Sequence, residues 1–419
     1  MKIKFIFIIL FVVFAFKLHA QHTKSELEKI FPNSLKVQLK NTLSANRVDV
    51  PIVLQVSDIV KKHKNFNSQA LVVFSDNSEI ASQANDLNSD GKDDEIVFVI
   101  DLKSGETKEI EILYKTTGIE KRVYKKRTQA ELSHKFGGNF ENRKYIGGEF
   151  RNVSYLKVPT EHTDHSFYIR YEGPGWESDK VGFRFYLDWR NATDVFGKKT
   201  NEMILQNVGL DGFDSYHEPA VWGQDVFKAG KSLGIGSFGI LNGQNIVHVS
   251  VVDSVDCQIV VNGCVKSLIR TNYYGWTVGN QKYHVTSDIS IFAGSRLTHV
   301  ELTFNHTPDS LVTGFIRDIS GMFFTDSSAN FNAMALYQKC LANDNLGIAI
   351  IVPARNMVQT GATETDYFYQ LGNFKNKVSY SFLAAWEQEP GGITNSDAFK
   401  SEIRRVLSEL EAPIIIKIK

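Results

Sequence analysis

The feature that most constrains the fold is a succession of short apolar and aromatic segments separated by polar or glycine-containing turns. Ile110, Ile112 and Tyr114 occupy alternate positions, and Glu109 and Glu111 flank Ile110, as expected for a strand with one buried face. Several short strands of this kind, spaced by about 10–20 residues, are typical of β-sandwiches rather than of alternating strands and helices. The segments are 71–74, 96–100, 110–114, 167–170, 183–187, 246–249, 289–292 and 300–304. We therefore predict an all-β protein.

Changes in composition divide the chain. Residues 35–117 predict a small Ig-like β-sandwich, and the charged, then glycine-rich stretch 118–150 predicts a linker. Residues 151–419 predict a large antiparallel, supersandwich-like β-sandwich with few helices. The one convincing long helix has an apolar stripe at helical spacing, a cap at Asn395 or Ser396 and a stop at Pro413. Residues 414–418 then predict a closing strand.

The first twenty residues have the pattern of a secretory signal peptide. Lys2 and Lys4 precede an apolar run over residues 5–16, which ends before the small residue Ala20. Such a run is shorter than the roughly 20 residues that span a bilayer, and no later segment approaches that length. We expect a secreted, periplasmic protein that is not inserted in a membrane.

Charge and cysteine content narrow the function further. The charges of the 47 basic and 47 acidic residues cancel, so the chain lacks the net positive charge that is typical of nucleic-acid-binding proteins. Only three cysteines occur. Export would permit a disulfide between Cys257 and Cys264, but buried free thiols are the simpler interpretation.

Residues 171–234 concentrate the side chains that carbohydrate sites need. Aromatic rings stack on the apolar face of a pyranose, and fixed charged or amide groups bind its hydroxyls. Phe183, Phe185 and Leu187 alternate with polar residues, which predicts a polar face bearing Arg184, Tyr186 and Asp188. The candidate substrate-binding residues of this region are Trp176, Glu177, Tyr186, Trp222, Asp225 and Lys228. The alternative for each is an ordinary packing or surface role, with Trp189 and Phe196 in the core and Asp188–Arg190 as a surface pair.

His217 is the best single catalytic candidate. It lies between Tyr216 and Glu218, ahead of Asp225, in a segment that predicts a loop. A loop histidine beside a tyrosine and carboxylates suits proton transfer near neutral pH. A hydrogen-bonded structural histidine is the competing interpretation.

Two other motifs offer metal-ligand side chains. The loop 86–95 has oxygen ligands at calcium-loop spacing with Gly91 at the turn, but it lacks the terminal glutamate and the flanking helices of an EF-hand. Either a structural calcium site or a hydrogen-bonded hairpin turn fits the pattern. The candidate calcium ligands are Asp86, Asn88, Asp90 and Asp94. His162 and His165 have the spacing of a metal pair, but a polar loop before a strand is the preferred interpretation.

Three of these stretches together resemble the DUF4861 family of Bacteroidetes polysaccharide-utilisation systems. They are EGPGWESDKVGFRFYLDWRNATDVFGKK, YHEPAVWGQDVFKAGKSLG and DLNSDGKDDE. The resemblance extends over nearly the whole mature chain. It implies processing of acidic oligosaccharides from polymers such as ulvan or pectin. The implied activity is an oligosaccharide dehydratase, which removes water from a uronic acid at the non-reducing end.

Elimination beside a sugar carboxylate needs a cation, a base and an acid. We expect Arg184 or Lys198 to neutralise the carboxylate, His217 to take the C5 proton, and Tyr216 or Tyr186 to protonate the leaving hydroxyl. Trp176 and Trp222 would hold the ring, with Glu177 and Asp225 on its hydroxyls. The chemistry requires no cofactor, and the implied partner is an acidic oligosaccharide.

Three classes of function remain open on the sequence. The first is a β-elimination enzyme, either the dehydratase or a polysaccharide lyase, which would use similar machinery to break a glycosidic bond. A glycoside hydrolase would need a pair of carboxylates, for which the region offers several choices. A binding protein would hold uronate oligosaccharides without converting them.

Overall fold

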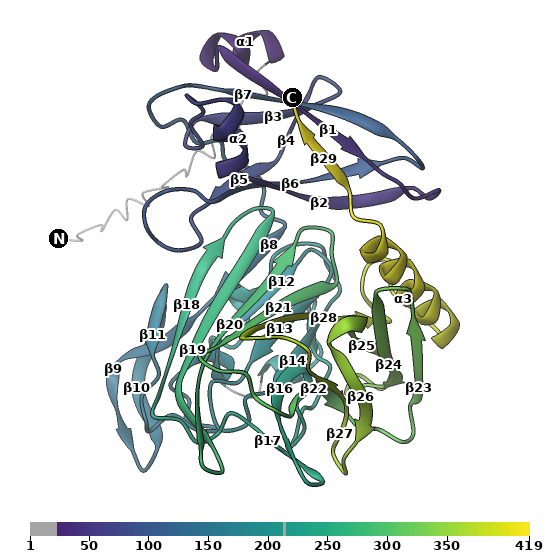
Figure 1. Cartoon of the computed structure of the whole chain (residues 1–419). Coiled ribbons are helices and arrows are strands. Elements are labelled where there is room, and N and C mark those ends of the chain that lie inside the picture. The colour runs from purple at the N-terminus through teal and green to yellow at the C-terminus, as the bar shows by residue number, and fades with distance from the viewer. Residues whose placement is uncertain (1–22, 213–214) are drawn as a thin grey trace, which may run out of the picture.

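The computed structural model describes residues 23–212 and 215–419. The predicted signal peptide over residues 1–20 lies outside the described residues. The described chain is mainly strand, with three α-helices, and most of its strands pair antiparallel in several sheets, so the predicted all-β class is confirmed. Figure 1 shows a smaller sandwich above a larger body of sheets. No helix in the described part of the chain is both long and apolar enough to cross a membrane.

The smaller unit is a sandwich of two sheets around its own core. Leu39, Ile52, Phe98 and Ile112 are among its buried residues. One sheet has the order β29 (Ile415–Ile418), β1 (Asn33–Lys40), β7 (Thr107–Tyr114), β3 (Leu71–Ser75) and β4 (Ser78–Ile80). The other consists of β2 (Arg47–Gln55), β6 (Glu95–Leu102) and β5 (Ser82–Asn85). The short helices α1 (Lys24–Ile30) and α2 (Val56–Lys62) lie at this sandwich.

The last strand of the chain belongs to this N-terminal sandwich, not to the large domain predicted for residues 151–419. β29 pairs with β1, with Ile418 opposite Val37 and Ile416 opposite Leu39 (Figure 1). Ile414 and Ile418 also pack against the sandwich core. The apolar alternation of residues 414–418 predicts a strand, but it carries no information about which sheet that strand joins.

Removing this strand is expected to destabilise the N-terminal sandwich. Deletion of residues 414–419 exposes the edge of β1 and removes the apolar contacts that Ile414 and Ile418 make with the core, so we expect the free energy of unfolding to fall by about 2–3 kcal/mol. Urea denaturation and limited proteolysis between residues 33 and 114 measure the effect. Lys419→Ala, which removes only the exposed ion pair with Glu109, serves as the control and should cost less than about 1 kcal/mol. Equal stability of the deletion and the control would contradict this prediction.

The larger unit is built on one nine-stranded antiparallel sheet. Its strands are β11 (Tyr155–Lys157), β18 (Ser254–Asn262), β19 (Lys266–Val278), β20 (Gln281–Phe292), β21 (Leu297–Phe304), β28 (Lys377–Trp386), β25 (Asn345–Pro353), β24 (Phe331–Lys339) and β23 (Met322–Ser327). Helix α3 (Ser396–Glu411) packs Phe399 and Ile403 against Ala349 and Leu383 on one face. Asn395 caps this helix by accepting a hydrogen bond from the Ala398 N–H, as predicted.

Two five-stranded sheets cover the opposite face. The first consists of β15 (Gly223–Asp225), β14 (Thr193–Lys198), β13 (Gly182–Phe185), β12 (Gly175–Ser178) and β8 (Thr128–Glu131). The second consists of β17 (Asn245–Val247), β16 (Ile235–Asn242), β22 (Leu311–Ile316), β27 (Asp366–Leu371) and β26 (Met357–Ala362). Trp176 and Phe238, from these two sheets, share the main apolar core with Tyr380 and Phe382 of the large sheet.

The segment predicted as a linker contains regular structure. Within residues 118–150, β8 joins the first five-stranded sheet, and β9 (Ser133–Glu141) pairs with β10 (Lys144–Asn152) in a hairpin. Gly137, Gly147 and Gly148 all have positive φ values, so the glycines mark irregular backbone within a hairpin rather than a flexible connection.

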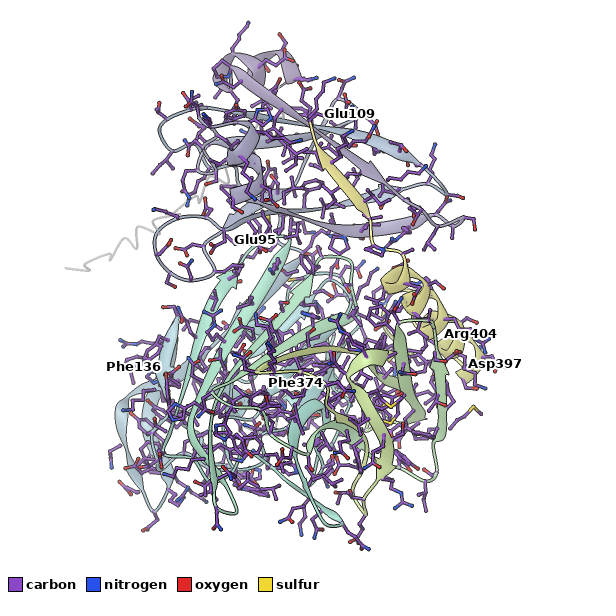
Figure 2. The ribbon with its side chains drawn as sticks, viewed as in Figure 1. Glu95, Glu109, Phe136, Phe374, Asp397 and Arg404 are labelled. Carbon is purple, nitrogen blue, oxygen red and sulfur yellow. The ribbon has the colours of Figure 1, made fainter. Side chains whose placement is uncertain are left out.

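The two units are joined by charged side chains. Lys266 of β19 donates a hydrogen bond of 2.7 Å to the buried carboxylate of Glu95, which Figure 2 labels at the junction. Arg127 reaches both Asp49 and Asp179 at 2.7 Å. All three cysteines lie in the described chain as free thiols, so Cys257 and Cys264 do not form a disulfide.

Candidate active site

The first five-stranded sheet has one apolar face and one charged face. Residues opposite each other in an antiparallel pair point to the same side, and Arg184 of β13 is opposite both Gly175 and Asp194. The apolar face carries Trp176, Phe183 and Val195 into the main core. The other face, which we call the charged face, carries Glu177, Arg184, Asp194, Lys198 and Asp225. The predicted alternation is confirmed for Phe183, Arg184 and Phe185, whereas Tyr186 and Asp188 lie beyond the end of β13, and Tyr186 packs with the main core.

Three single turns of 3-10 helix cover the charged face. They span Arg170–Glu172, Leu205–Asn207 and Ser215–His217. Tyr171, Leu205 and Tyr216 from these turns form a small apolar cluster with Phe196 of β14. The cluster shields the charged face from water, so its polar groups must find partners within the protein.

Arg184 is the centre of the resulting network. Its side chain is 2% exposed, and its Nη2 lies 2.6 Å from Asp225 Oδ2 and 3.0 Å from Asp194 Oδ2. Nη1 donates a hydrogen bond of 2.9 Å to the Tyr216 hydroxyl. Its guanidinium also lies 5.0 Å from the ring centre of Tyr186. Because the buried guanidinium binds side chains of the sheet and of a covering turn at the same time, it holds the two in one arrangement.

His217 lies where this network meets solvent. Its side chain is 32% exposed, and its Nδ1 is 3.3 Å from Asp225 Oδ2, the same oxygen that Arg184 binds. The imidazole also packs on Tyr216, with ring centres 4.6 Å apart. A buried carboxylate that contacts one ring nitrogen orients the ring, and such an orienting contact is typical of a histidine that serves as a general base.

Glu172 extends the network in the other direction. Its Oε2 lies 3.8 Å from Arg184 Nη1, and its Oε1 lies 3.0 Å from Arg190 Nη2. Arg190 also pairs with Asp188 and, at 2.9 Å, with Asp164. The Arg190 guanidinium stacks on the ring of Tyr186 at 3.8 Å from its centre.

The turns around Glu172 have an unusual backbone. His165, Phe167, Tyr171 and Glu172 all have positive φ values, although none is glycine. Left-handed backbone is costly for such residues and tends to occur where side chains must be held for function. Four such residues within one short segment mark it as part of the candidate site.

A cavity of about 220 Å³ lies at the Asp188 end of the network. Asp188, His162 and Thr163 are among its lining residues, as is Trp189. Trp189 is 48% exposed, so the interpretation of Trp189 as a core residue is wrong, and its ring is available as a flat apolar surface. Phe196, by contrast, is fully buried as predicted.

Three of the buried predicted site residues make contacts that leave them no role in binding a ligand. Trp176 is 1% exposed and donates a hydrogen bond from Nε1 to Thr298, so the prediction that it holds a sugar ring is wrong. Lys198 pairs with the carboxylate of Glu177, and both side chains are fully buried. Glu177 also accepts hydrogen bonds from the N–H groups of Ile204 and Leu205, so this pair anchors a covering turn and cannot reach a ligand.

The remaining predicted residues divide into two groups. Arg184, Tyr186, Tyr216, His217 and Asp225 are brought together, as described above. All of them except His217 are buried, so the prediction that Asp225 binds sugar hydroxyls is wrong. Trp222 is partly buried and packs edge-on against Phe196, at 6.0 Å between ring centres. Lys228 is exposed beyond the end of β15.

Glu172, Arg190, Asp164 and Asp194 are members of the network that the sequence did not single out as site residues. Asp194 could have been found, because it shares the charged face with Arg184 by simple alternation along adjacent strands. Glu172 and Asp164 lie on irregular turns, for which the sequence gives no periodic signal.

Many side-chain oxygens of the acidic loop 86–95 accept hydrogen bonds from groups within the same loop. The Asp86 carboxylate accepts hydrogen bonds from the N–H groups of Ser89 and Gly91, both at 2.7 Å, and Asp94 accepts one from Leu87. The Asn88 side chain also donates to Asp94, and Asp90 accepts from the Lys92 N–H. These contacts form the predicted hairpin turn, and they are compatible with a bound ion, so calcium binding remains a prediction.

Burial makes the Asp194 carboxyl a weaker acid than usual. It raises the pKa of this carboxyl to about 7, with the neighbouring Asp225 adding to the rise and Arg184 opposing it. Because the folded-state pKa is above the ordinary value of 3.8, the native state binds more protons than the unfolded state between these two values. The contribution of the protonated Asp194 carboxyl to the free energy of unfolding is complete at low pH and is lost as the pH rises through about 7.

Asp194→Asn removes this titration. We expect the free energy of unfolding of the wild type to fall more steeply than that of the variant as the pH rises from about 4 to about 7. Denaturant unfolding at a series of pH values measures the two slopes. Glu389, whose pKa is also raised to about 7 by burial, titrates in both proteins and provides the common background. Parallel slopes would contradict the prediction.

The fold and site define a two-unit all-β protein with a buried charge network that reaches solvent at a histidine. The chain belongs to the DUF4861 family, because the model of that family, described as a domain of unknown function, matches residues 39–416. No curated protein sequence matches the chain.

Two solved structures align with most of the chain at low similarity. An alpha-mannosidase from Enterococcus faecalis V583 aligns over 92% of this chain at 10% identity, with a TM-score of 0.45. A protein in the glycosyl hydrolase family 38 from Enterococcus faecalis aligns over 92% at 10% identity, with a TM-score of 0.40. This chain spans about half the length of either protein, since the alignments cover 46% and 47% of them.

Proposed function

We propose that the chain is a carbohydrate-active dehydratase. Its substrate would be an acidic oligosaccharide, from which it removes water at the uronic acid of the non-reducing end to leave an unsaturated uronyl group. The observation that carries the proposal is the contact of the partly exposed His217 with Asp225, at 3.3 Å, in a network centred on Arg184. The family resemblance, which extends over nearly the whole mature chain, supplies the reaction type. The predicted signal peptide supports a site of action outside the cytoplasm.

The proposed reaction is a β-elimination. His217, oriented through Nδ1 by Asp225, takes the C5 proton with its other ring nitrogen, and the electrons of the C–H bond form the C4=C5 double bond. The C4–O bond breaks, and the departing hydroxide takes up a proton to leave as water. Negative charge develops on the sugar carboxylate in the transition state, which is the charge that the site must stabilise.

The buried tyrosines have a different role in this proposal from the one expected on sequence. Tyr216 is 2% exposed and Tyr186 is 5% exposed, and their hydroxyls contact Arg184 and Asp194. Burial raises the pKa of both phenols, so both stay protonated at neutral pH. They act as positioning residues for the network, and the proton for the leaving hydroxyl would come from His217 itself or from water.

Trp189 is the candidate for the sugar platform. It lines the cavity beside Asp188 and is half exposed, whereas Trp176 is enclosed in the core. An exposed indole beside charged groups provides the apolar surface on which a pyranose stacks.

Incubation with oligosaccharides that carry a saturated uronic acid at the non-reducing end tests the proposal. We expect a product lighter by one water molecule, of unchanged chain length, with the ultraviolet absorbance of a conjugated uronate. Chain shortening with an unsaturated end would indicate a lyase, and chain shortening with gain of water a hydrolase. Tight binding without conversion would indicate a binding protein. Each of these three results would overturn the dehydratase proposal.

A further inference from the structure

The site around His217 has too little positive charge to bind an acidic sugar by itself. Within the described chain, the two guanidinium groups of Arg184 and Arg190 face a larger set of carboxylates. These carboxylates are Asp164, Glu172, Asp188, Asp194 and Asp225. Even with Asp194 protonated, four carboxylates remain against two cations.

Two buried cations of the surrounding structure do not correct this imbalance. Lys198 is fully buried and neutralised by Glu177, and Arg170 is 2% exposed and pairs with Glu131. Arg184 is also 2% exposed, with its Nη groups directed at carboxylates and a phenol of the protein. A substrate carboxylate that approached His217 would meet net negative charge, which costs binding energy and opposes the enolate that elimination forms.

One cluster at this site has the composition of a metal site. Ligand atoms of Asp164, His165 and Glu172 all lie within 4.8 Å of one another. His165 and Asp164 come from the loop before the Arg170–Glu172 turn, and their side chains are 46% and 34% exposed. The cluster therefore has an open side on which a further ligand can bind.

Glu172 provides an oxygen suited to a cation. The residue is 4% exposed, and its Oε1 is held by the His165 N–H at 3.0 Å and by Arg190 at 3.0 Å. Its Oε2 is buried and has no hydrogen-bond partner among the described residues; Arg184 is 3.8 Å away. A buried carboxylate oxygen without a hydrogen bond is costly unless another positive group binds it.

We infer that Asp164, His165 and Glu172 bind a divalent transition-metal ion of the zinc or manganese type. One imidazole and two carboxylates are ligands for these ions, whereas calcium prefers oxygen ligands alone. Bonds of about 2.0–2.2 Å place ligands in a tetrahedral site roughly 3.3–3.6 Å apart, so small side-chain rotations close the cluster around an ion. Arg190 keeps its contact with Glu172 Oε1 while Oε2 takes the metal.

The bound ion would supply the missing positive charge. It would face the substrate on the exposed side of His165 and bind the carboxylate of the acidic sugar, while His217 takes the neighbouring proton. This role rests on the proposed dehydratase function. The binding of the ion does not, because it depends only on the three side chains.

Metal binding is tested on the full mature chain after treatment with a chelator. Calorimetric titration with ZnCl₂ and with MnCl₂ is expected to show one site, and the apparent melting temperature should rise with metal. The double variant Asp164→Asn/His165→Asn is expected to bind at least tenfold more weakly. Asparagine is chosen at position 165 because it tolerates the left-handed backbone there. The conservative single variant Asp164→Glu should retain binding in part.

Two controls define the outcome. Glu161→Gln changes an exposed carboxylate in the same loop and should bind metal as the wild type does. Asp90→Asn alters the acidic loop 86–95 and should affect calcium only. Unchanged zinc and manganese affinity in the double variant, or no binding by the wild type, would overturn the inference.

The dehydratase assay separates the two proposals. Metal binding without conversion of any uronate oligosaccharide would leave the metal site standing and reject the proposed function. Full conversion by chelator-treated protein would reject the role of the ion, even where binding is observed. Activity that is lost with the chelator and restored by zinc or manganese is the expected result.

Discussion

His217→Gln is expected to reduce the rate of dehydration by about 10²–10⁴-fold, because glutamine cannot take the C5 proton. The side chain is of similar size and partly exposed, so the fold should be unaffected. Steady-state kinetics on a saturated uronate oligosaccharide should show the loss in kcat with little change in KM.

Two further variants show whether His217 acts through its contact with Asp225. His284→Gln changes an exposed histidine of β20 and should leave the rate unchanged. Asp225→Asn removes the carboxylate that contacts His217 Nδ1, so we expect kcat to fall because the ring loses the partner that orients it. Near-wild-type turnover by His217→Gln would remove this histidine from the mechanism.

Replacing Arg184 is expected to have the largest effect on stability. Arg184→Met leaves Asp194 and Asp225 close together in the interior without the cation that lies 3.0 and 2.6 Å from them. Breaking a buried ion pair by removing one partner costs roughly 3–5 kcal/mol, because the remaining charge has lost its compensation. Denaturant unfolding measures this loss as a change in the free energy of unfolding.

The matched variants for Arg184 differ in charge and in exposure. Arg184→Lys keeps the charge but cannot bind Asp194, Asp225 and Tyr216 together, so an intermediate loss is expected. Lys228→Ala removes an exposed cation from the same region and should change the free energy of unfolding by less than about 0.5 kcal/mol. A loss below about 1 kcal/mol for Arg184→Met would show that the network tolerates the missing cation.

Local patterns in the sequence predicted the sheets better than they predicted the site. The alternation around Arg184 fixed which side chains share a face, and the apolar stripe of Phe399 and Ile403 identified the one long helix. Both depend on the geometry of a single element, which repeats at a known period. The partner of β29 and the strands within residues 118–150 depend on pairing between distant segments, which such patterns do not encode.

The candidate site shows the same limit. A tryptophan in a glycine-rich segment fits a binding loop, but Trp176 lies on the apolar face of a strand that packs against the large sheet. Lys198 is on the charged face, yet its ammonium is used by Glu177. Glu172 and Asp164 are close to Arg190 only because irregular turns fold over the sheet, and turns of this kind follow no repeating pattern.

The pairing of β29 with β1 also has a consequence for folding order. A chain emerging from its N-terminus presents β1 nearly four hundred residues before its outer partner is available, by the sequence positions of the two strands. Until then the edge of β1 offers unsatisfied amide and carbonyl groups to any other extended chain. The first unit to be synthesised is therefore the last to be completed, and its assembly depends on long-range contacts that close slowly.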